Sequence, residues 1–162
     1  MRKQRGFTLI ELLIVIAIIS IVSSIALITL SYNPNKNVNS FANQLLQIMT
    51  LAEHEALLRP AILGLGFTEN SYQFYQFDSS AKWNVLKDNV WKRRSIPKNI
   101  QVTLKINNES IALNGIPSIV FTENSEVTPF VILLGIKGSN PIFQIKGEAS
   151  GVVKIERYRQ DE

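Results

Sequence analysis

The sequence contains no cysteine and only one histidine, so two side chains that often carry catalysis or bind metals are almost missing. Without cysteine the chain has no disulfide, no thiolate metal site and no thiol nucleophile. His54 lies between Glu53 and Glu55 on the polar side of a predicted helix, where a solvated histidine is expected rather than a general base. No nucleophile and base stand in a recognisable arrangement. We therefore expect no catalytic residue and no enzymatic activity.

Phosphate-binding and metal-binding patterns are also missing. Gly64-Leu65-Gly66 is too short for a phosphate loop and lies in a strand-like pattern. Glu109, Glu123 and Glu126 are candidates for a calcium site, but they lack the dense Asp and Asn spacing of a calcium loop. We expect no metal and no other cofactor.

The excess of positive charge is small once the N-terminus is set aside. The chain has 17 basic and 13 acidic residues, a net charge of +4. Arg2, Lys3 and Arg5 supply three of the positive charges, which leaves 14 basic and 13 acidic residues in the rest of the chain. The remaining charge of +1 says little about a nucleic-acid partner.

A long apolar run follows this basic start. It extends from Leu12 to Leu30, about 19 residues, and is interrupted only by serines and a threonine, which helices in lipid tolerate. Extended back to Phe7, the helix would be about 36 Å long, against a hydrocarbon core of about 30 Å. Basic residues precede the run and only Lys36 follows it closely. The positive-inside rule therefore places the N-terminus in the cytoplasm and the rest of the chain outside.

A secretory signal peptide is the alternative interpretation of this segment. Ser24-Ile25-Ala26 offers the small-x-small site that signal peptidases cut. However, the apolar run is longer than the usual h-region of about 7 to 15 residues. A signal peptide also has no use for Glu11, a carboxylate near the start of the run.

The segment from Lys3 to Val15, KQRGFTLIELLIV, resembles the N-terminus of type IV pilins and type II pseudopilins. In that family a short basic leader ends in Gly, the mature chain begins with Phe, and a Glu follows four residues later. The resemblance implies that a prepilin peptidase cuts between Gly6 and Phe7 and methylates the new amine of Phe7. It also implies that the helix remains as an anchor in the bacterial inner membrane, in contact with membrane lipid.

Glu11 is the residue expected to act in assembly. A carboxylate within a membrane is costly, so Glu11 is expected to have a partner. The α-amine of Phe7, largely cationic at neutral pH, is about one helical turn away in the same chain. The same amine of a neighbouring chain would fix the axial offset between subunits. The alternative is that Glu11 reaches the lipid headgroups without a fixed partner.

A second helix is predicted after a polar segment. Residues 31–37 contain Pro34 and predict a break or kink. From Val38 to Arg59 the apolar residues recur every three or four positions and predict an amphipathic helix that ends before Pro60. This apolar face consists of Val38, Phe41, Leu45, Ile48, Ala52 and Ala56. Leu51 and Leu58 fall on the polar side, either as ordinary exposed leucines or as a contact for a neighbouring subunit.

Beyond Pro60 the periodicity changes to two. The alternation is clearest where Ile100, Val102, Leu104 and Ile106 are separated by polar residues. Further short strands are predicted at 62–67, 72–77, 110–113, 118–122, 130–134, 142–146 and 152–156. About eight strands behind one helix predict an α+β domain over 38–162, with one or two antiparallel sheets. A cleaved leader at 1–6, a membrane and assembly helix at 7–30 and the break at 31–37 precede it.

Motifs scattered along this domain carry a second resemblance. Three segments are similar to segments of H-type minor pseudopilins of the type II secretion system and of FimT-type minor pilins. They are Leu58-Arg59-Pro60, Glu126-Val127-Thr128-Pro129-Phe130 and Gly151-Val152-Val153-Lys154-Ile155. The H-type resemblance implies a structural subunit at the tip of a periplasmic pseudopilus that helps export folded proteins across the outer membrane. Its implied partners are the I, J and K types of minor pseudopilin and the major pseudopilin. The chain has Thr122 and Ser125 where the family often has Pro and Gly.

Nucleic-acid binding is the competing function. Cations and aromatic rings are interleaved, as in single-strand binders, at Lys82, Trp83, Lys87, Trp91, Lys92, Arg93 and Arg94. Of these, Trp91, Lys92, Arg93 and Arg94 are the candidate nucleic-acid contacts. Lys154, Arg157, Tyr158 and Arg159 add a basic segment near the C-terminus. The FimT-type resemblance implies a role in DNA uptake for such residues. Acidic neighbours dilute both clusters, and the alternative is that they form solvated loops, so a nucleic-acid partner is not the expected one.

Overall fold

The computed structural model describes residues 8–30 and 34–159, without the side chains of residues 23–30 and of Pro34. The chain forms two units, Met1–Pro34 and Asn35–Glu162. Helix α1 (Leu9–Leu30) belongs to the first unit, and helix α2 (Pro34–Leu58) opens the second. Proline is well tolerated in the first turn of a helix, because the amide it lacks would have no partner there. Residues 34–37 are therefore helical and not part of a break as predicted, and residues 31–33 lie outside the described residues.

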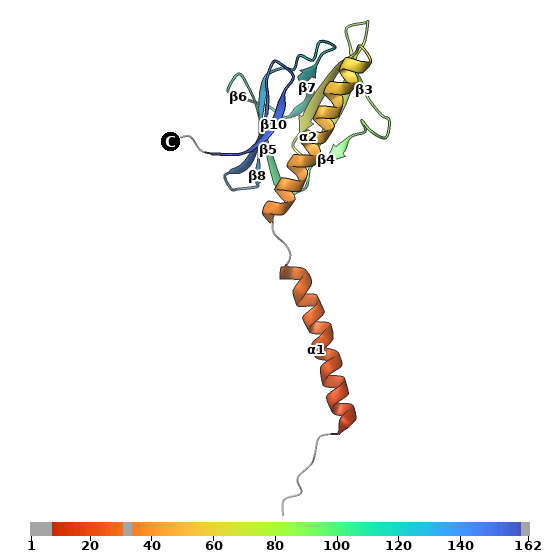
Figure 1. Cartoon of the computed structure of the whole chain (residues 1–162), viewed down its shortest axis with the longest axis vertical. Helices are drawn as coiled ribbons and strands as arrows, with labels where there is room; N and C mark the ends of the chain where they lie inside the picture. Colours follow the sequence, from red (N-terminus) through yellow and green to blue (C-terminus); the bar gives the residue numbers. More distant parts are fainter. Residues whose placement is uncertain (1–7, 31–33, 160–162) are drawn as a thin grey trace, which may run out of the picture. The chain divides into compact units, whose positions relative to one another are not determined.

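The second unit is an α+β domain with two antiparallel sheets, which confirms the predicted fold class (Figure 1). Within the described residues there are ten strands: β1 (Ile62–Thr68), β2 (Ser71–Phe77), β3 (Trp83–Val85), β4 (Arg94–Ser95), β5 (Ile100–Ile106), β6 (Glu109–Ile111), β7 (Asn114–Phe121), β8 (Phe130–Ile136), β9 (Pro141–Gly147) and β10 (Val153–Arg157). Sheet A has the order β3-β2-β1-β7, with β4 also paired to β2, and sheet B has the order β10-β9-β8-β5-β6. The two strands beyond the expected eight are β3 and β4. They have three and two residues, too few to produce an alternating pattern.

Helix α2 and both sheets share one hydrophobic core. All six residues predicted for the apolar face of the helix are buried, and Ala42 and Met49 are buried with them. The predicted polar side is confirmed as well, since His54 and Leu58 are exposed. The domain is therefore organised around a single amphipathic helix, as its 3.6-residue periodicity indicates.

Strand β1 is buried on both faces, which explains the two glycines within it. A Cβ atom on Gly64 would lie 2.7 Å from both the Pro117 Cβ and the Trp83 ring. On Gly66 it would lie 2.4 Å from the carbonyl oxygen of Gly115. The glycines therefore let the Trp83 ring and strand β7 approach β1 closely, which is a packing role and not a phosphate-binding one.

The shared core predicts different effects for two leucines of the same helix. Leu45 is fully buried, and Leu45→Ala should reduce the free energy of unfolding of the Asn35–Glu162 unit by about 2–5 kcal/mol, because it leaves a cavity. Leu58 is 77% exposed, so Leu58→Ala should change it by less than about 0.5 kcal/mol. Urea unfolding followed by circular dichroism measures both, and equal losses would contradict this arrangement of the core.

Candidate assembly and binding sites

The start of α1 shows how Glu11 is positioned. The backbone amide of Glu11 donates hydrogen bonds to the carbonyl oxygen of Thr8 at 3.1 Å and to its Oγ1 at 3.3 Å, and the amide of Leu12 also donates to the Thr8 carbonyl. Thr8 is therefore the N-cap of the helix, and Glu11 is its third residue. The Thr-x-x-Glu spacing at a helix start is the sequence signal of a capping box, which was not among the predicted features, and the Thr8 half of that box is formed here. Gly6 and Phe7, the predicted processing residues, lie outside the described residues.

The carboxylate of Glu11 is placed favourably for a helix but remains available to a partner. In the first turn it lies near the positive end of the helix macrodipole. Its side chain is exposed and accepts no hydrogen bond from any described residue. Local capping thus uses the Glu11 amide and leaves its carboxylate for another contact.

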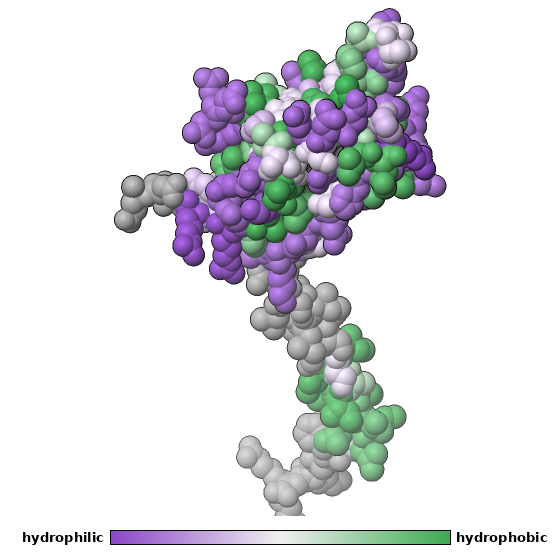
Figure 2. Space-filling model, turned by 45° about the horizontal axis from the view of Figure 1, so that its top comes forward, coloured by the Kyte–Doolittle hydropathy of each residue, from purple (hydrophilic) through white to green (hydrophobic). Residues whose placement is uncertain are grey.

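The described side chains of α1 form an exposed apolar surface (Figure 2). Eleven large apolar residues from Leu9 to Val22 are between 44% and 79% exposed. Apolar patches of this kind mark surfaces that contact lipid or other proteins.

Among the residues that the structure describes, no helix is long and apolar enough to qualify as a membrane span. The side chains of residues 23–30, which belong to the predicted membrane segment, are outside that description.

The basic segment at residues 91–94 separates into one buried aromatic residue and three cations. Trp91 is only 6% exposed, and its ring packs edge-on against Phe74 with 5.1 Å between the ring centroids. The indole is therefore unavailable for stacking on a base. Lys92 and Arg93 are exposed and Arg94 is half-buried. The sequence pattern alone did not distinguish the aromatic residue from its neighbours.

The position of this segment is fixed by a buried amide. Gln73 Nε2 donates hydrogen bonds to the carbonyl oxygens of Leu86 at 2.8 Å and Trp91 at 3.1 Å. Asp88 Oδ1 accepts from the amides of Val90 and Trp91, at 3.0 and 2.9 Å. The segment leading to the three cations is thus held on the edge of sheet A by polar contacts.

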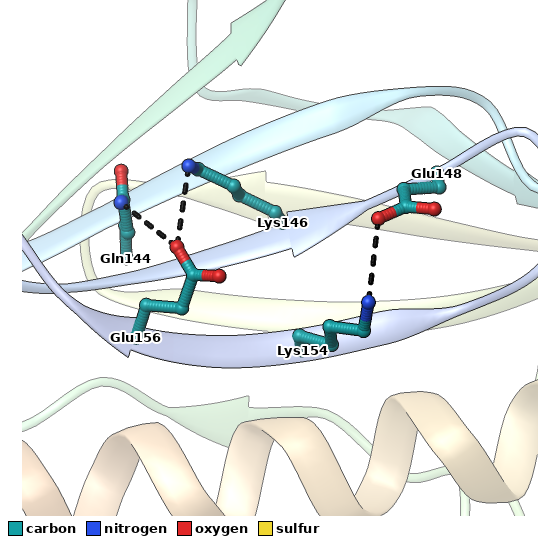
Figure 3. Close-up of polar contacts among 5 residues, drawn as sticks. All are labelled: Gln144, Lys146, Glu148, Lys154 and Glu156. Carbon is teal, nitrogen blue, oxygen red and sulfur yellow. Dashed lines mark hydrogen bonds and ion pairs between the residues drawn. The ribbon is translucent and has the colours of Figure 1, made fainter.

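Cations of the C-terminal region are partly neutralised across strands β9 and β10 (Figure 3). Lys146 and Lys154 are directly opposite each other, an unfavourable pairing of like charges. Each lysine contacts a diagonal carboxylate instead: Lys146 Nζ lies 3.2 Å from Glu156 Oε2, and Lys154 Nζ lies 3.6 Å from Glu148 Oε1. Gln144 Nε2 also donates to Glu156. These exposed ion pairs contribute little stability, about 0–1 kcal/mol each, but they partly neutralise two lysines of this face.

Two cavities border the basic residues singled out in the sequence. Arg157, Tyr158 and Arg159 line one of about 720 Å³ on sheet B, which also includes the paired Lys146 and Glu156. Lys92, Arg93 and Arg94 line another of about 580 Å³ between α2 and strand β4. Within residues 8–30 and 34–159, no group of three His, Cys, Asp or Glu side chains is placed to hold a metal ion.

Comparison with known proteins relates the chain to pilin-like subunits. Residues 1–27 match a family model described as the prokaryotic N-terminal methylation motif. A relative from Pseudomonas aeruginosa is 26% identical over 153 residues, covering 85% of this chain and 87% of the relative. A relative from Escherichia coli K12 is 22% identical over 144 residues, covering 86% and 85%. Both relatives bear the name type II secretion system protein H.

Solved structures show the same fold. The minor pseudopilin EpsH from the type II secretion system of Vibrio cholerae superposes with a TM-score of 0.69 at 15% identity, covering 80% of this chain and all of that one. The solution structure of E. coli GspH superposes with a TM-score of 0.60, also at 15% identity, covering 78% of this chain and 94% of that one. The two-sheet domain with its long helix is thus shared despite low sequence identity.

The burial of Trp91 predicts a stability defect rather than a binding defect. Trp91→Ala should lower the free energy of unfolding of the domain by about 3–5 kcal/mol, because it removes a buried ring that packs on Phe74. Val90→Ala is the control, since Val90 is 43% exposed and its truncation should cost less than about 0.5 kcal/mol. Denaturant titration compares the two variants. A Trp91→Ala domain with unchanged stability would show that the indole is a surface group.

Proposed function

We propose that this chain, which belongs to the H-type minor pseudopilins of the type II secretion system, acts as a structural subunit of the pseudopilus tip. The observation that carries the proposal is the extent of the similarity. It covers 85% and 86% of the chain in two relatives of that name, and it includes both the N-terminal methylation motif and the two-sheet domain. The protein is a structural subunit and not an enzyme.

The prepilin-type N-terminus anchors the protein in the inner membrane before assembly. In our proposal residues 7–30 cross the bilayer once, with the N-terminus in the cytoplasm and the domain in the periplasm. Arg2, Lys3 and Arg5 before the helix support this orientation. The exposed apolar side chains of α1 support a lipid environment first, and contacts with neighbouring helices after assembly.

Glu11 then directs assembly in this proposal. The prepilin peptidase removes residues 1–6 and methylates the amine of Phe7, and Glu11 pairs with the corresponding amine of an adjacent subunit. Thr8 supports this role because its side chain accepts from the Glu11 amide, so the carboxylate is not needed for capping. The subunit would join minor pseudopilins of the I, J and K types and the major pseudopilin, and the complete structure would move folded proteins through the outer membrane.

Processing is the first prediction from this proposal. The mature protein should begin at N-methylated Phe7, because only a cut after Gly6 keeps the apolar helix and creates the amine that Glu11 requires. Intact-mass spectrometry of protein extracted from membranes measures the mass directly. A start after Ala26, as signal peptidase would produce, or an intact Met1–Gly6 leader would contradict the prediction.

Deletion and complementation test the function. A strain without this chain should retain type II substrates in its periplasm, and the wild-type gene should restore secretion. Glu11→Gln should insert into the membrane normally, since removing a charge from lipid is favourable, yet it should fail to restore secretion. Thr8→Ser retains the helix cap and serves as the matched control. Normal secretion by the deletion strain would overturn the proposed function, whereas normal secretion by the Glu11→Gln strain would overturn only the role of Glu11.

A further inference from the structure

The cavity between α2 and strand β4 is lined by cations without a counter-charge. Lys92, Arg93 and Arg94 border it from one side, and none of them forms an ion pair with a carboxylate in residues 8–30 or 34–159. In the same domain, by contrast, Lys146 and Lys154 each contact a glutamate. Lys146 and Lys154 are thus each balanced by a glutamate, whereas among the described residues the three cations at this cavity are not.

Arg94 is the cation of this cavity whose backbone and guanidinium are most constrained by the fold. Strand β4 pairs Arg94 with Tyr72 of β2, so its backbone is fixed by the sheet. Its Nη2 donates to the carbonyl oxygen of Val90 at 3.0 Å, while its Nε is shielded from solvent and has no hydrogen-bond partner among the described residues. A shielded donor without an acceptor is unfavourable, and an anion that entered the cavity and drew the guanidinium toward it would supply the missing acceptor.

The remaining walls provide neutral hydrogen-bonding groups and no acidic one. From α2 they include Ser40 and Gln44, and from sheet A they include Tyr72 and Ser95. Burial raises the pKa of the Tyr72 hydroxyl, and Arg94 opposes that rise in part. Tyr72 therefore remains a neutral phenol at neutral pH and adds no negative charge to the walls.

We propose that this Arg94 cavity receives an aspartate or glutamate side chain of a neighbouring pilin-type subunit in the assembled pseudopilus. The planar guanidinium binds a carboxylate with two parallel hydrogen bonds, and Lys92 and Arg93 at the rim increase the attraction. The segment that carries these cations is held in place by Gln73 and Asp88, so little ordering is required on binding. This inference rests on the proposed function, because it names the partner chemistry of a subunit that works by assembly.

A nucleic acid is the less suitable occupant. Single-strand binders combine a basic groove with exposed rings on which bases stack. Here the nearby rings are in the core, since Trp91 is 6% and Tyr72 is 4% exposed. Elsewhere in the domain, Lys146 and Lys154 each contact a glutamate, so these two lysines are less available to phosphates.

Charge reversal in the full-length chain, expressed in the deletion strain, tests the proposal. Arg94→Glu should reduce by about tenfold or more the amount of this chain recovered with the other pilin-type subunits after crosslinking in cells, because a like charge then faces the carboxylate. Lys87→Glu is the matched control, with the same change of charge in the same segment but outside the cavity, and should have no effect. If Arg94→Glu lowers the amount of protein in the membrane, the double variant Lys92→Glu with Arg93→Glu replaces it, because both side chains are exposed.

A selection for restored secretion in the Arg94→Glu strain identifies the partner. We expect suppressors that replace an aspartate or glutamate of another subunit by a neutral or basic residue. Normal recovery of the stable charge-reversed variants, or suppressors confined to this chain, would overturn the proposal. Salt-sensitive binding of a dT oligonucleotide that is lost in Arg94→Glu but retained in Lys87→Glu would overturn it in favour of nucleic acid. Whichever result is obtained, secretion by the deletion strain tests the proposed function independently of the Arg94 cavity.

Discussion

The burial of the apolar face of α2 is the interaction on which the domain depends. Residues from Val38 to Ala56 contribute to a core that also takes side chains from both sheets, so neither sheet has a separate core. Because the helix is the direct continuation of the N-terminal unit in sequence, the same element that completes the core also links the domain to the segment proposed for membrane anchoring. A substitution inside this face therefore affects the fold first and assembly only indirectly.

The N-terminal motif both starts helix α1 and presents a free carboxylate, within the four residues from Thr8 to Glu11. Thr8 accepts from the Glu11 amide and begins α1 within an apolar segment, where an unpaired amide would be especially costly. The carboxylate of the same glutamate is left without a described partner. One short motif thus meets a local requirement of the backbone and presents a charge for which a neighbouring subunit is the proposed partner.

Charge on the domain is distributed unevenly, although its total is small. On β9 and β10, lysines that oppose each other are compensated by glutamates two residues away along the strands. At the Arg94 cavity the cations have no such compensation among the described residues. A net charge near zero therefore conceals a local positive site, and its position beside α2 is a property of the folded chain.

The N-terminal motif, the amphipathic face of α2 and the α+β class could all be predicted from the sequence, because each depends on spacing within a short segment. Val38, Phe41, Leu45, Ile48, Ala52 and Ala56 were all predicted to be buried and all are. The role of residues 91–94 could not be predicted in this way. A tryptophan beside three cations indicates a binding surface, but in the folded domain its ring packs against Phe74. Strands β3 and β4 are too short to show a period, and the pairing of Lys146 and Lys154 with carboxylates on β9 and β10 is visible only in the folded domain. For Trp91 and for the two lysines the explanation is that side-chain contacts between separate segments leave no periodic trace in either segment.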